Sequence, residues 1–301
     1  MVQAALGETA SSWRRRLAGP VLLADRGSDD AEIARRAAAD VAAHAGVPLR
    51  LVTAWEVPAI ARVTPTTGEW DVSGVYENSA LAAQQVVRDH LASLGVRVGP
   101  GYVAEGSATA VVAQTADMID DSVVVIGSRA GRGVGGHLMG MLPEAFVRGM
   151  HRPVLAVRGQ SADWPPSSII IVDADGSDDP AVADEGAALA RVLKVPAALV
   201  RVTSQRSAAG FDGRDEPSLE SVREDVRRRA SRLEAESGAE VTSWVTTGEP
   251  VGVFLGLASD PRVLVAAGRD ARHHGLGRIV SALLHEAAGP VLIVPERRRD
   301  F

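Results

Sequence analysis

Two Gly-rich segments of this chain carry residue types that suit a phosphate-binding turn. Each follows a short apolar run, which starts at Val123 in one case and at Val263 in the other. A Gly-rich turn between a parallel strand and a helix presents backbone N–H groups at the positive end of the helix dipole. The residues of this kind are Gly127, Arg129, Gly131 and Gly140 in the first segment, and Gly268 and Arg269 in the second. These residues suit an anion, and they suit a solvated basic loop equally well.

Several classes of reactive site are missing from the sequence. The chain has no cysteine, which excludes disulfides, thiol catalysis and Cys-based metal sites. It has neither the Gly-x-x-x-x-Gly-Lys-Ser/Thr of a P-loop nor the Gly-x-Ser-x-Gly of a serine hydrolase. The adjacent His273 and His274 are poorly placed to share one metal ion. We therefore expect no catalytic residue, no metal site and no enzyme activity based on a nucleophile and a base.

The elements around the two segments form a repeat. Val123–Val157 reads as a buried strand, a Gly-rich turn, a helix and a second buried strand, and Val263–Val294 repeats that arrangement. The offset between the copies is roughly 140–150 residues, which is the size of one small domain. The sequence therefore predicts a duplicated unit.

Strands alternate with helices through both halves of the chain. This alternation predicts parallel strands, right-handed crossovers and an α/β fold class. We expect two repeated three-layer α/β/α units, each with a five-stranded parallel sheet. The predicted boundaries are residues 19–158 for the first unit, 159–168 for a linker and 169–296 for the second unit.

One long helix is predicted over residues 75–94. Its core face is expected to consist of Leu81, Val86, Val87, Leu91 and Leu94. The third strand of the first unit is expected next, over residues 96–104.

Net charge and the lengths of the apolar runs limit the kinds of partner that the chain is expected to bind. The formal net charge is −6, which does not suggest a nucleic-acid partner. No apolar run reaches the roughly 20 residues of a membrane span, and we see no secretory signal. We expect a cytoplasmic protein that binds neither nucleic acid nor a membrane.

From about Pro20 to Pro295 the chain resembles the universal stress protein family in its tandem, two-domain form. The resemblance rests on the two Gly-rich segments and on Asp175-Gly176-Ser177. It implies an adenine-nucleotide alpha hydrolase-like core, dimerisation through the fifth strand, and ATP or AMP bound at Gly-x2-Gly-x9-Gly-Ser/Thr. An Asp at the end of the first strand completes the family's pattern, and a residue of the second strand lines the adenine pocket.

Each unit keeps a different part of that pattern. In the first unit Ala130 and Met141 replace the second glycine and the hydroxyl residue, and Arg26 stands one place after Asp25. In the second unit Ala271 and Ala282 depart from the pattern. The cofactor-binding candidates are Asp25, Ala54, Gly127, Arg129, Gly131 and Gly140 in the first unit, and Asp175, Gly176, Val202, Gly268, Arg269 and Ser281 in the second.

Two functions remain open on the sequence. The first is a regulatory stress-response protein that binds ATP or AMP, with Mg²⁺ accompanying ATP, and that hydrolyses ATP slowly or not at all. The alternative is a structural or interaction protein of the same fold that binds no nucleotide. In both cases we expect the strands Val154–Val157 and Val291–Val294 to pair in cis. We also expect a homodimer and a regulatory protein partner of unknown identity.

Overall fold

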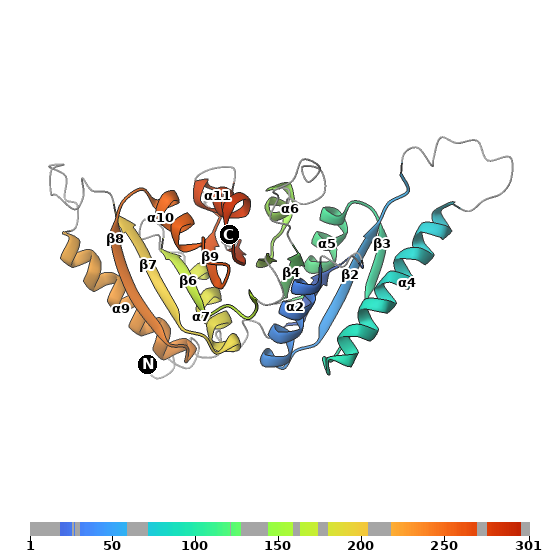
Figure 1. The fold of residues 1–301 in the computed structure, drawn as a ribbon, viewed down its shortest axis with the longest axis horizontal. Helices are drawn as coiled ribbons and strands as arrows, with labels where there is room; N and C mark the ends of the chain where they lie inside the picture. Colours follow the sequence, from blue (N-terminus) through green and yellow to red (C-terminus); the bar gives the residue numbers. More distant parts are fainter. Residues whose placement is uncertain are drawn as a thin grey trace, which may run out of the picture.

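The computed structural model describes residues 19–25, 27, 31–58, 72–120, 122–127, 144–158, 163–173, 180–203, 218–269 and 276–295. Ten strands form one sheet in the order β3-β2-β1-β4-β5-β10-β9-β6-β7-β8 (Figure 1). The strands are β1 (Val21–Ala24), β2 (Leu49–Trp55), β3 (Tyr102–Glu105), β4 (Val123–Gly127), β5 (Val154–Val157), β6 (Ser168–Asp173), β7 (Ala197–Thr203), β8 (Val241–Thr247), β9 (Val263–Gly268) and β10 (Val291–Val294).

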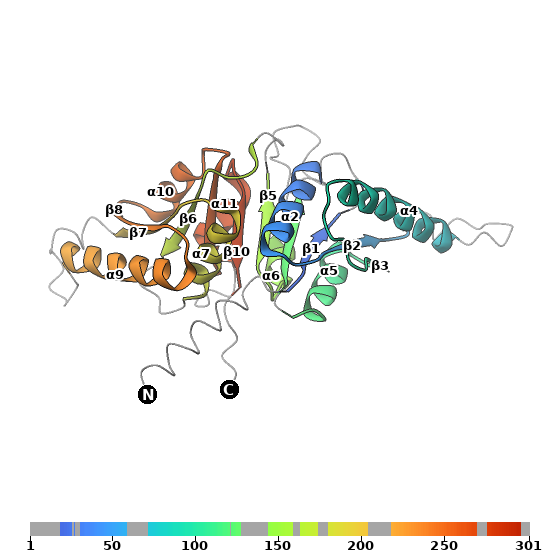
Figure 2. The same ribbon diagram turned by 90° about the horizontal axis from the view of Figure 1, so that it is seen from below.

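Eight helices of the described residues cover this sheet. They are α2 (Glu32–Ala45), α4 (Val72–Ser93), α5 (Ala108–Asp117), α6 (Glu144–Gly149), α7 (Ala181–Leu193), α9 (Leu219–Ser237), α10 (Pro250–Leu257) and α11 (Arg278–Glu286). Figure 2 shows α9, α7, α2 and α4 following one another along the molecule. The α/β fold class expected from the alternation of strands and helices is confirmed. Among the described helices, none is long and apolar enough to cross a membrane.

Strands β5 and β10 join the two halves of the chain. They run antiparallel, with Val291 opposite Ala156 and Leu292 opposite Leu155, whereas all other neighbouring strands of the sheet are parallel. Both strands are buried along their whole length. Together with the adjacent helices α6 and α11, they form what we call the internal interface.

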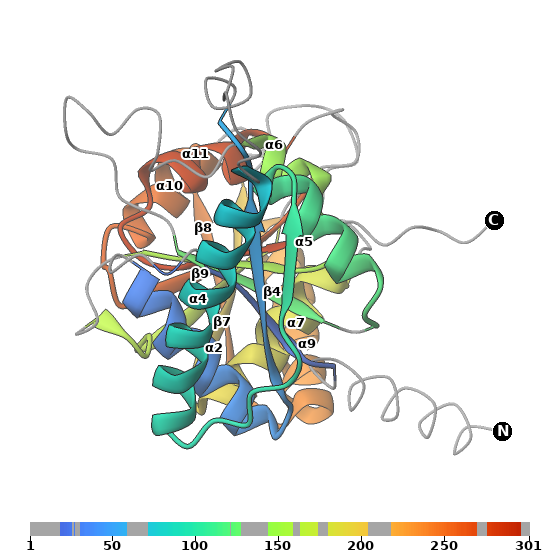
Figure 3. The ribbon, with the colours of Figure 1, turned by 90° about the vertical axis from the view of Figure 1, so that its right-hand side faces the viewer.

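Alternate residues of each strand belong to two different hydrophobic cores, because successive side chains of a strand point to opposite faces of the sheet. Leu23 and Leu155 of the first half share one core with Ile171 of the second half and with helices α2, α4, α7 and α9. Leu22 belongs to the other core, together with residues of α5, α6, α10 and α11. In Figure 3, α2 and α4 lie on one side of the strands of the first half and α5 lies on the other. Each core continues from one half into the other.

The described residues of the predicted linker, 163–168, are bonded to both halves. Trp164 is buried, and its indole Nε1 donates a 2.8 Å hydrogen bond to Asp40 of α2. The backbone N–H of Ser167 donates to the carbonyl of Arg262, just before β9. Trp164 and Ser167 therefore add contacts between the halves.

Helix α4 differs from its sequence-based prediction in phase. Val87 and Leu91 are buried as expected, but Leu81, Val86 and Leu94 are exposed, so their assignment to the core was wrong. Ala80 and Gln84 complete the buried face instead. Gln84 tolerates burial because its amide donates to Thr53 Oγ1 and to the Tyr102 carbonyl at 3.1 and 2.9 Å. Strand β3 is also shorter than expected, with a single isolated bridge at Val98 before it.

Candidate functional site

The carboxyl ends of β1 and β4 lie side by side in the first half, between β2 and β5. Strand order reverses there, and open α/β sheets bind ligands outside the carboxyl ends of the strands at such a point. The ends of β6 and β9 form the same arrangement in the second half. Asp25 and Gly127 occupy the first position, and Asp173 and Gly268 the second.

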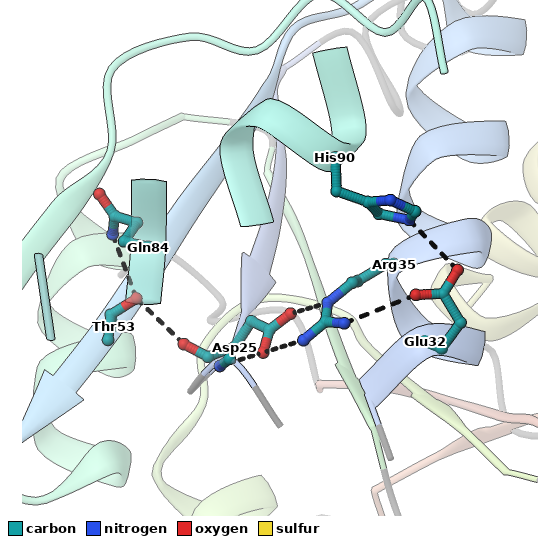
Figure 4. Close-up of polar contacts among 7 residues, drawn as sticks. Asp25, Glu32, Arg35, Thr53, Gln84 and His90 are labelled. Atoms are coloured by element: carbon teal, nitrogen blue, oxygen red, sulfur yellow. Dashed lines mark hydrogen bonds and ion pairs between the residues drawn. The ribbon is translucent and has the colours of Figure 1, made fainter. Parts of the chain in front are cut away.

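Asp25 directly follows β1 and continues its ladder, with its N–H donating to the Val52 carbonyl. Its carboxylate lies 2.6 Å from Arg35 Nε and also accepts from Arg35 Nη2 at 3.2 Å (Figure 4). The N–H of Gly27 donates to the same carboxylate at 2.7 Å. The Asp25 side chain is only 2% exposed. A buried carboxylate needs such partners, so the charge of Asp25 is already balanced within the chain.

Arg35 and its neighbours connect this carboxylate to two helices and two further strands. Glu32 lies 3.5 Å from Arg35 and 3.3 Å from His90 of α4. Burial alone would lower the pKa of Arg35, but the hydrogen bonds and charges of Asp25 and Glu32 outweigh it and raise the pKa. On the other side, Thr53 donates to the Asp25 carbonyl at 3.0 Å. Gln84 binds Thr53 in turn, as Figure 4 shows.

Asp173 is the structural equivalent of Asp25 in the second half. Val21 pairs with Leu49 at the start of β1, and Ile169 pairs with Ala197 in the same way in β6. The helices that follow end at Gly46 and Lys194, both in the left-handed conformation. The strands and the helices thus give the same offset in residue number between the two halves. This offset differs by one residue from the offset that would align the sequence Gly-Ser-Asp-Asp at 27–30 with the same sequence at 176–179.

Asp173 is also bound by arginine, but from different elements. Arg201 of β7 lies 2.7 Å from its carboxylate, and Arg229 of α9 donates to it at 2.8 Å. Asp225 lies 3.2 Å from Arg201, so two carboxylates and two guanidinium groups alternate. The Asp173 side chain is 2% exposed. Asp173 was not among the residues predicted from the sequence. The alignment of Val21-Leu-Leu-Ala-Asp25 with Ile169-Ile-Ile-Val-Asp173 nevertheless indicates that the two aspartates are equivalent.

Gly127 and Gly268 end the strands that precede the Gly-rich segments. A side chain at Gly268 would place its Cβ 2.5 Å from Val182 Cγ2 of α7, so the close approach of that helix requires glycine. Ala54 and Val202 occupy equivalent places in β2 and β7, and both contact the core on the α5 and α10 face. Val202 is buried and Ala54 half-buried.

Arg269 and Ser281 lie in the internal interface. Arg269 Nη1 donates to the carbonyls of Arg148 and Val147, at the carboxyl end of α6, at 2.9 and 3.4 Å. Ser281 Oγ donates to Glu144, the first residue of α6. These two predicted phosphate-binding residues of the second half therefore bind the first half.

Glu144 is the centre of a small polar cluster in this interface. The hydrogen bond from Ser281 lowers the pKa of Glu144 despite the opposing effect of burial, and His285 and Arg148 add to the lowering. The distances from Glu144 to His285 and Arg148 are 3.6 and 3.3 Å.

Five of the predicted residues lie outside the described part of the chain: Arg129, Gly131, Gly140, Asp175 and Gly176. Within the described ranges, no three His, Asp or Glu residues come together in a way that would hold a metal ion. The described candidates with polar side chains are therefore Asp25, Arg269 and Ser281, and each is bonded to another part of the chain.

Residues 18–158 match the model of the universal stress protein family. A universal stress protein from Archaeoglobus fulgidus DSM 4304 is 14% identical, with a TM-score of 0.66 over 95% of this chain and 100% of that one. A functionally unknown protein from Pseudomonas aeruginosa PAO1 is also 14% identical, with a TM-score of 0.59 over 92% of each chain. No curated protein matches. At these identities the two structures support the fold of both halves.

Proposed function

We propose that this chain is a stress-response protein that acts through protein partners and not through a bound nucleotide. The premise is that its first half belongs to the universal stress protein family and that its second half repeats the same fold. The observation that carries this proposal is the burial of Asp25 and Asp173 in ion pairs with arginine. Asp25 directly follows β1 and Asp173 is the last residue of β6, so both lie at the end of the first strand of their half. They stand one and two residues before Arg26 and Asp175, which occupy the place of the family's ligand-binding Asp.

The energetic cost of freeing either carboxylate supports the proposal. A ligand that took Asp25 as its partner would leave Arg35 buried without its main counter-ion. Breaking a buried pair in this way costs about 3–5 kcal/mol. Since about 1.4 kcal/mol changes an affinity tenfold, this cost would weaken nucleotide binding by a factor of roughly a hundred or more.

The internal interface supports the proposal independently. Arg269 and Ser281 would have to leave Arg148 and Glu144 before they bound a phosphate group. Their present contacts hold the two halves of the chain together. A protein whose candidate ligand residues maintain a fixed pair of domains is suited to presenting a constant surface to partners.

Adenine-nucleotide binding is the second candidate, because the strand order reverses between β1 and β4 and between β6 and β9. In that case Ala54 and Val202 would line the adenine. ATP, with Mg²⁺, or AMP would place its phosphate groups on the Gly-rich segments. Slow ATP hydrolysis belongs to this candidate and would be measured as released phosphate.

Titration calorimetry of the full chain with ATP and then AMP, with and without Mg²⁺, separates the two candidates. The proposal expects no binding heat and no change in unfolding temperature at millimolar nucleotide. Micromolar binding would overturn it. Asp175→Ala is then the variant that locates the ligand, because loss of binding would place the ligand in the second half and retention would place it in the first.

A further inference from the structure

The outer face of α4 carries an apolar stripe. Val75, Ser79, Ala82 and Val86 are spaced at i, i+4, i+7 and i+11, so they fall along one line of the helix. This line lies opposite the buried residues Ala80, Gln84, Val87 and Leu91. Val75 is 58% exposed and Val86 is 70% exposed. The stripe therefore faces away from the core.

Helix α9 fills the equivalent place in the second half with a different surface. Its exposed side chains form ion pairs along the helix: Glu220 with Arg223, Glu224 with Arg227, Asp225 with Arg228, and Arg232 with Glu236. By contrast, residues 78–87 of α4 contain no charged side chain. The position in the fold is thus compatible with a helix whose outer face is charged, and the apolar outer face of α4 needs another explanation.

We propose that the stripe on α4 binds the same stripe on a second copy of the chain, with the two helices antiparallel about a twofold axis. The pattern is self-complementary under this symmetry. Val75 would contact the second copy's Val86, and Ser79 would contact its Ala82. The small residues at the centre let the helix axes approach closely, and the valines pack on either side.

The polar and charged groups of α4 are compatible with burial of this face. The Ser79 hydroxyl donates to the Val75 carbonyl of its own helix at 2.8 Å, so it needs no water. Gln85 donates to Asp89 at 2.7 Å within the helix. The charged residues of α4 are confined to Glu77, Arg88 and Asp89, and the proposed axis brings no two like charges together.

The contact is expected to be weak. From Val75 to Val86 the stripe is about 17 Å long at 1.5 Å per residue. Such a helix pair falls below the roughly 1,200 Å² of a stable interface, so we expect dissociation constants on the order of micromolar or weaker. Helix α4 lies at the far end of the first half from β5 and β10 in Figures 1 and 2. The dimer would therefore leave the internal interface intact.

Sedimentation velocity of the full chain over a wide concentration range tests this proposal. We expect a monomer–dimer equilibrium, and we expect Val86→Glu to weaken dimerisation at least tenfold because two carboxylates would enter the contact. Ser231→Glu on the exposed face of α9 is the matched control and should leave the equilibrium unchanged. A monomer at all concentrations, or a dimer that survives Val86→Glu, would overturn the proposal.

Engineered cysteines test the antiparallel register, since the natural chain has none. The double variant Ser79→Cys/Ala82→Cys should form a covalent dimer under mild oxidation. The double variant Arg228→Cys/Ser231→Cys has the same spacing on α9 and should stay monomeric. Equal cross-linking of the two variants would show random collision and count against the contact. Open-ended oligomers lost in Val86→Glu would show that α4 binds a different surface, which also contradicts the twofold model.

Discussion

Arg158 and Arg269 belong to different halves of the chain, and each donates hydrogen bonds to the carboxyl end of a helix in the other half. Arg158 follows β5 and binds the Ala287 carbonyl at 3.1 Å, the Leu283 carbonyl at 3.4 Å and the Leu284 carbonyl, at the end of α11. Arg269 follows β9 and binds the end of α6. A cation at the negative end of a helix dipole is favourable, and it adds to the one backbone N–H that Leu283 and Val147 each accept, from Ala287 and Met150. The internal interface is therefore held by reciprocal contacts in addition to the pairing of β5 with β10.

Arg158→Met should lower the free energy of unfolding by about 2–4 kcal/mol, because buried carbonyls would lose charge-assisted hydrogen bonds. Burial lowers the pKa of Arg158, so relief of that burial offsets part of the loss. Urea unfolding followed by circular dichroism measures the change. Arg97→Met is the control: Arg97 is exposed and donates to the Gly46 carbonyl, and a change below about 0.5 kcal/mol is expected. Equal effects of the two variants would contradict a special role for Arg158.

Asp25→Asn should destabilise the first half by about 3–5 kcal/mol, because Arg35 would stay buried without its carboxylate. The double variant Asp25→Asn/Arg35→Met removes both charges and should recover part of that loss. Asp89→Asn, at an exposed position of α4, is the control for an ordinary loss of charge. Thermal unfolding of the four proteins gives the comparison. If the double variant is less stable than Asp25→Asn alone, the pair is not the source of the effect.

Asp173→Asn should cost more than Asp25→Asn, because it removes one carboxylate from two arginines. Arg201 would keep Asp225, whereas Arg229 would lose the carboxylate that it binds at 2.8 Å. The measurement is the same unfolding experiment. A smaller loss for Asp173→Asn would mean that Asp225 compensates for both arginines.

Glu144 gives the internal interface a pH dependence. Its pKa is lowered in the folded protein from an ordinary value of 4.5, so the carboxylate stabilises the fold above that pH. The contribution is lost as the pH falls through the lowered pKa. Comparison of the wild type with Glu144→Gln at a series of pH values should show a difference at pH 7 that disappears in acid. A difference that grows toward low pH would have the wrong sign.

Gly268→Ala should destabilise the protein by about 1–3 kcal/mol through the clash with Val182. The double variant Gly268→Ala/Val182→Ala removes the opposing methyl groups and should regain part of the loss. Unfolding temperatures of both variants decide the point. If the second substitution gives no recovery, glycine is needed at this position for a reason other than the approach of α7.

The fold class and the central strands were predictable because buried parallel strands are continuous apolar runs. Strand β3, whose residues are half-buried or exposed, was predicted too long. The phase of α4 was not predictable, because Ala80 and Gln84 share its core face with Val87 and Leu91, while Leu81, Val86 and Leu94 face solvent. Burial of Gln84 depends on hydrogen-bond acceptors in β2 and β3, and the spacing of apolar residues along a helix gives no information about such acceptors.

The candidate site shows a second limit. Arg269 and Ser281 were predicted to bind phosphate from the basic character of the loop and from the position of Ser281 at the third glycine of the pattern, yet their partners lie more than 100 residues away in the first half. Asp173 was overlooked because Asp175, two residues later, matches the Asp-Gly-Ser of the family's pattern. Local spacing identifies residues able to bind an anion, but it does not reveal competing partners within the chain.

The antiparallel pairing of β5 with β10 has a consequence for synthesis of the chain. β10 follows every other strand of the sheet in sequence, so the ribosome completes it after the rest. Until then β5 is an apolar edge strand with unpaired backbone groups, the kind of edge that promotes aggregation. The nascent first half would therefore depend on chaperones, or on fast synthesis of the second half, and a truncation before Val291 should yield an insoluble product.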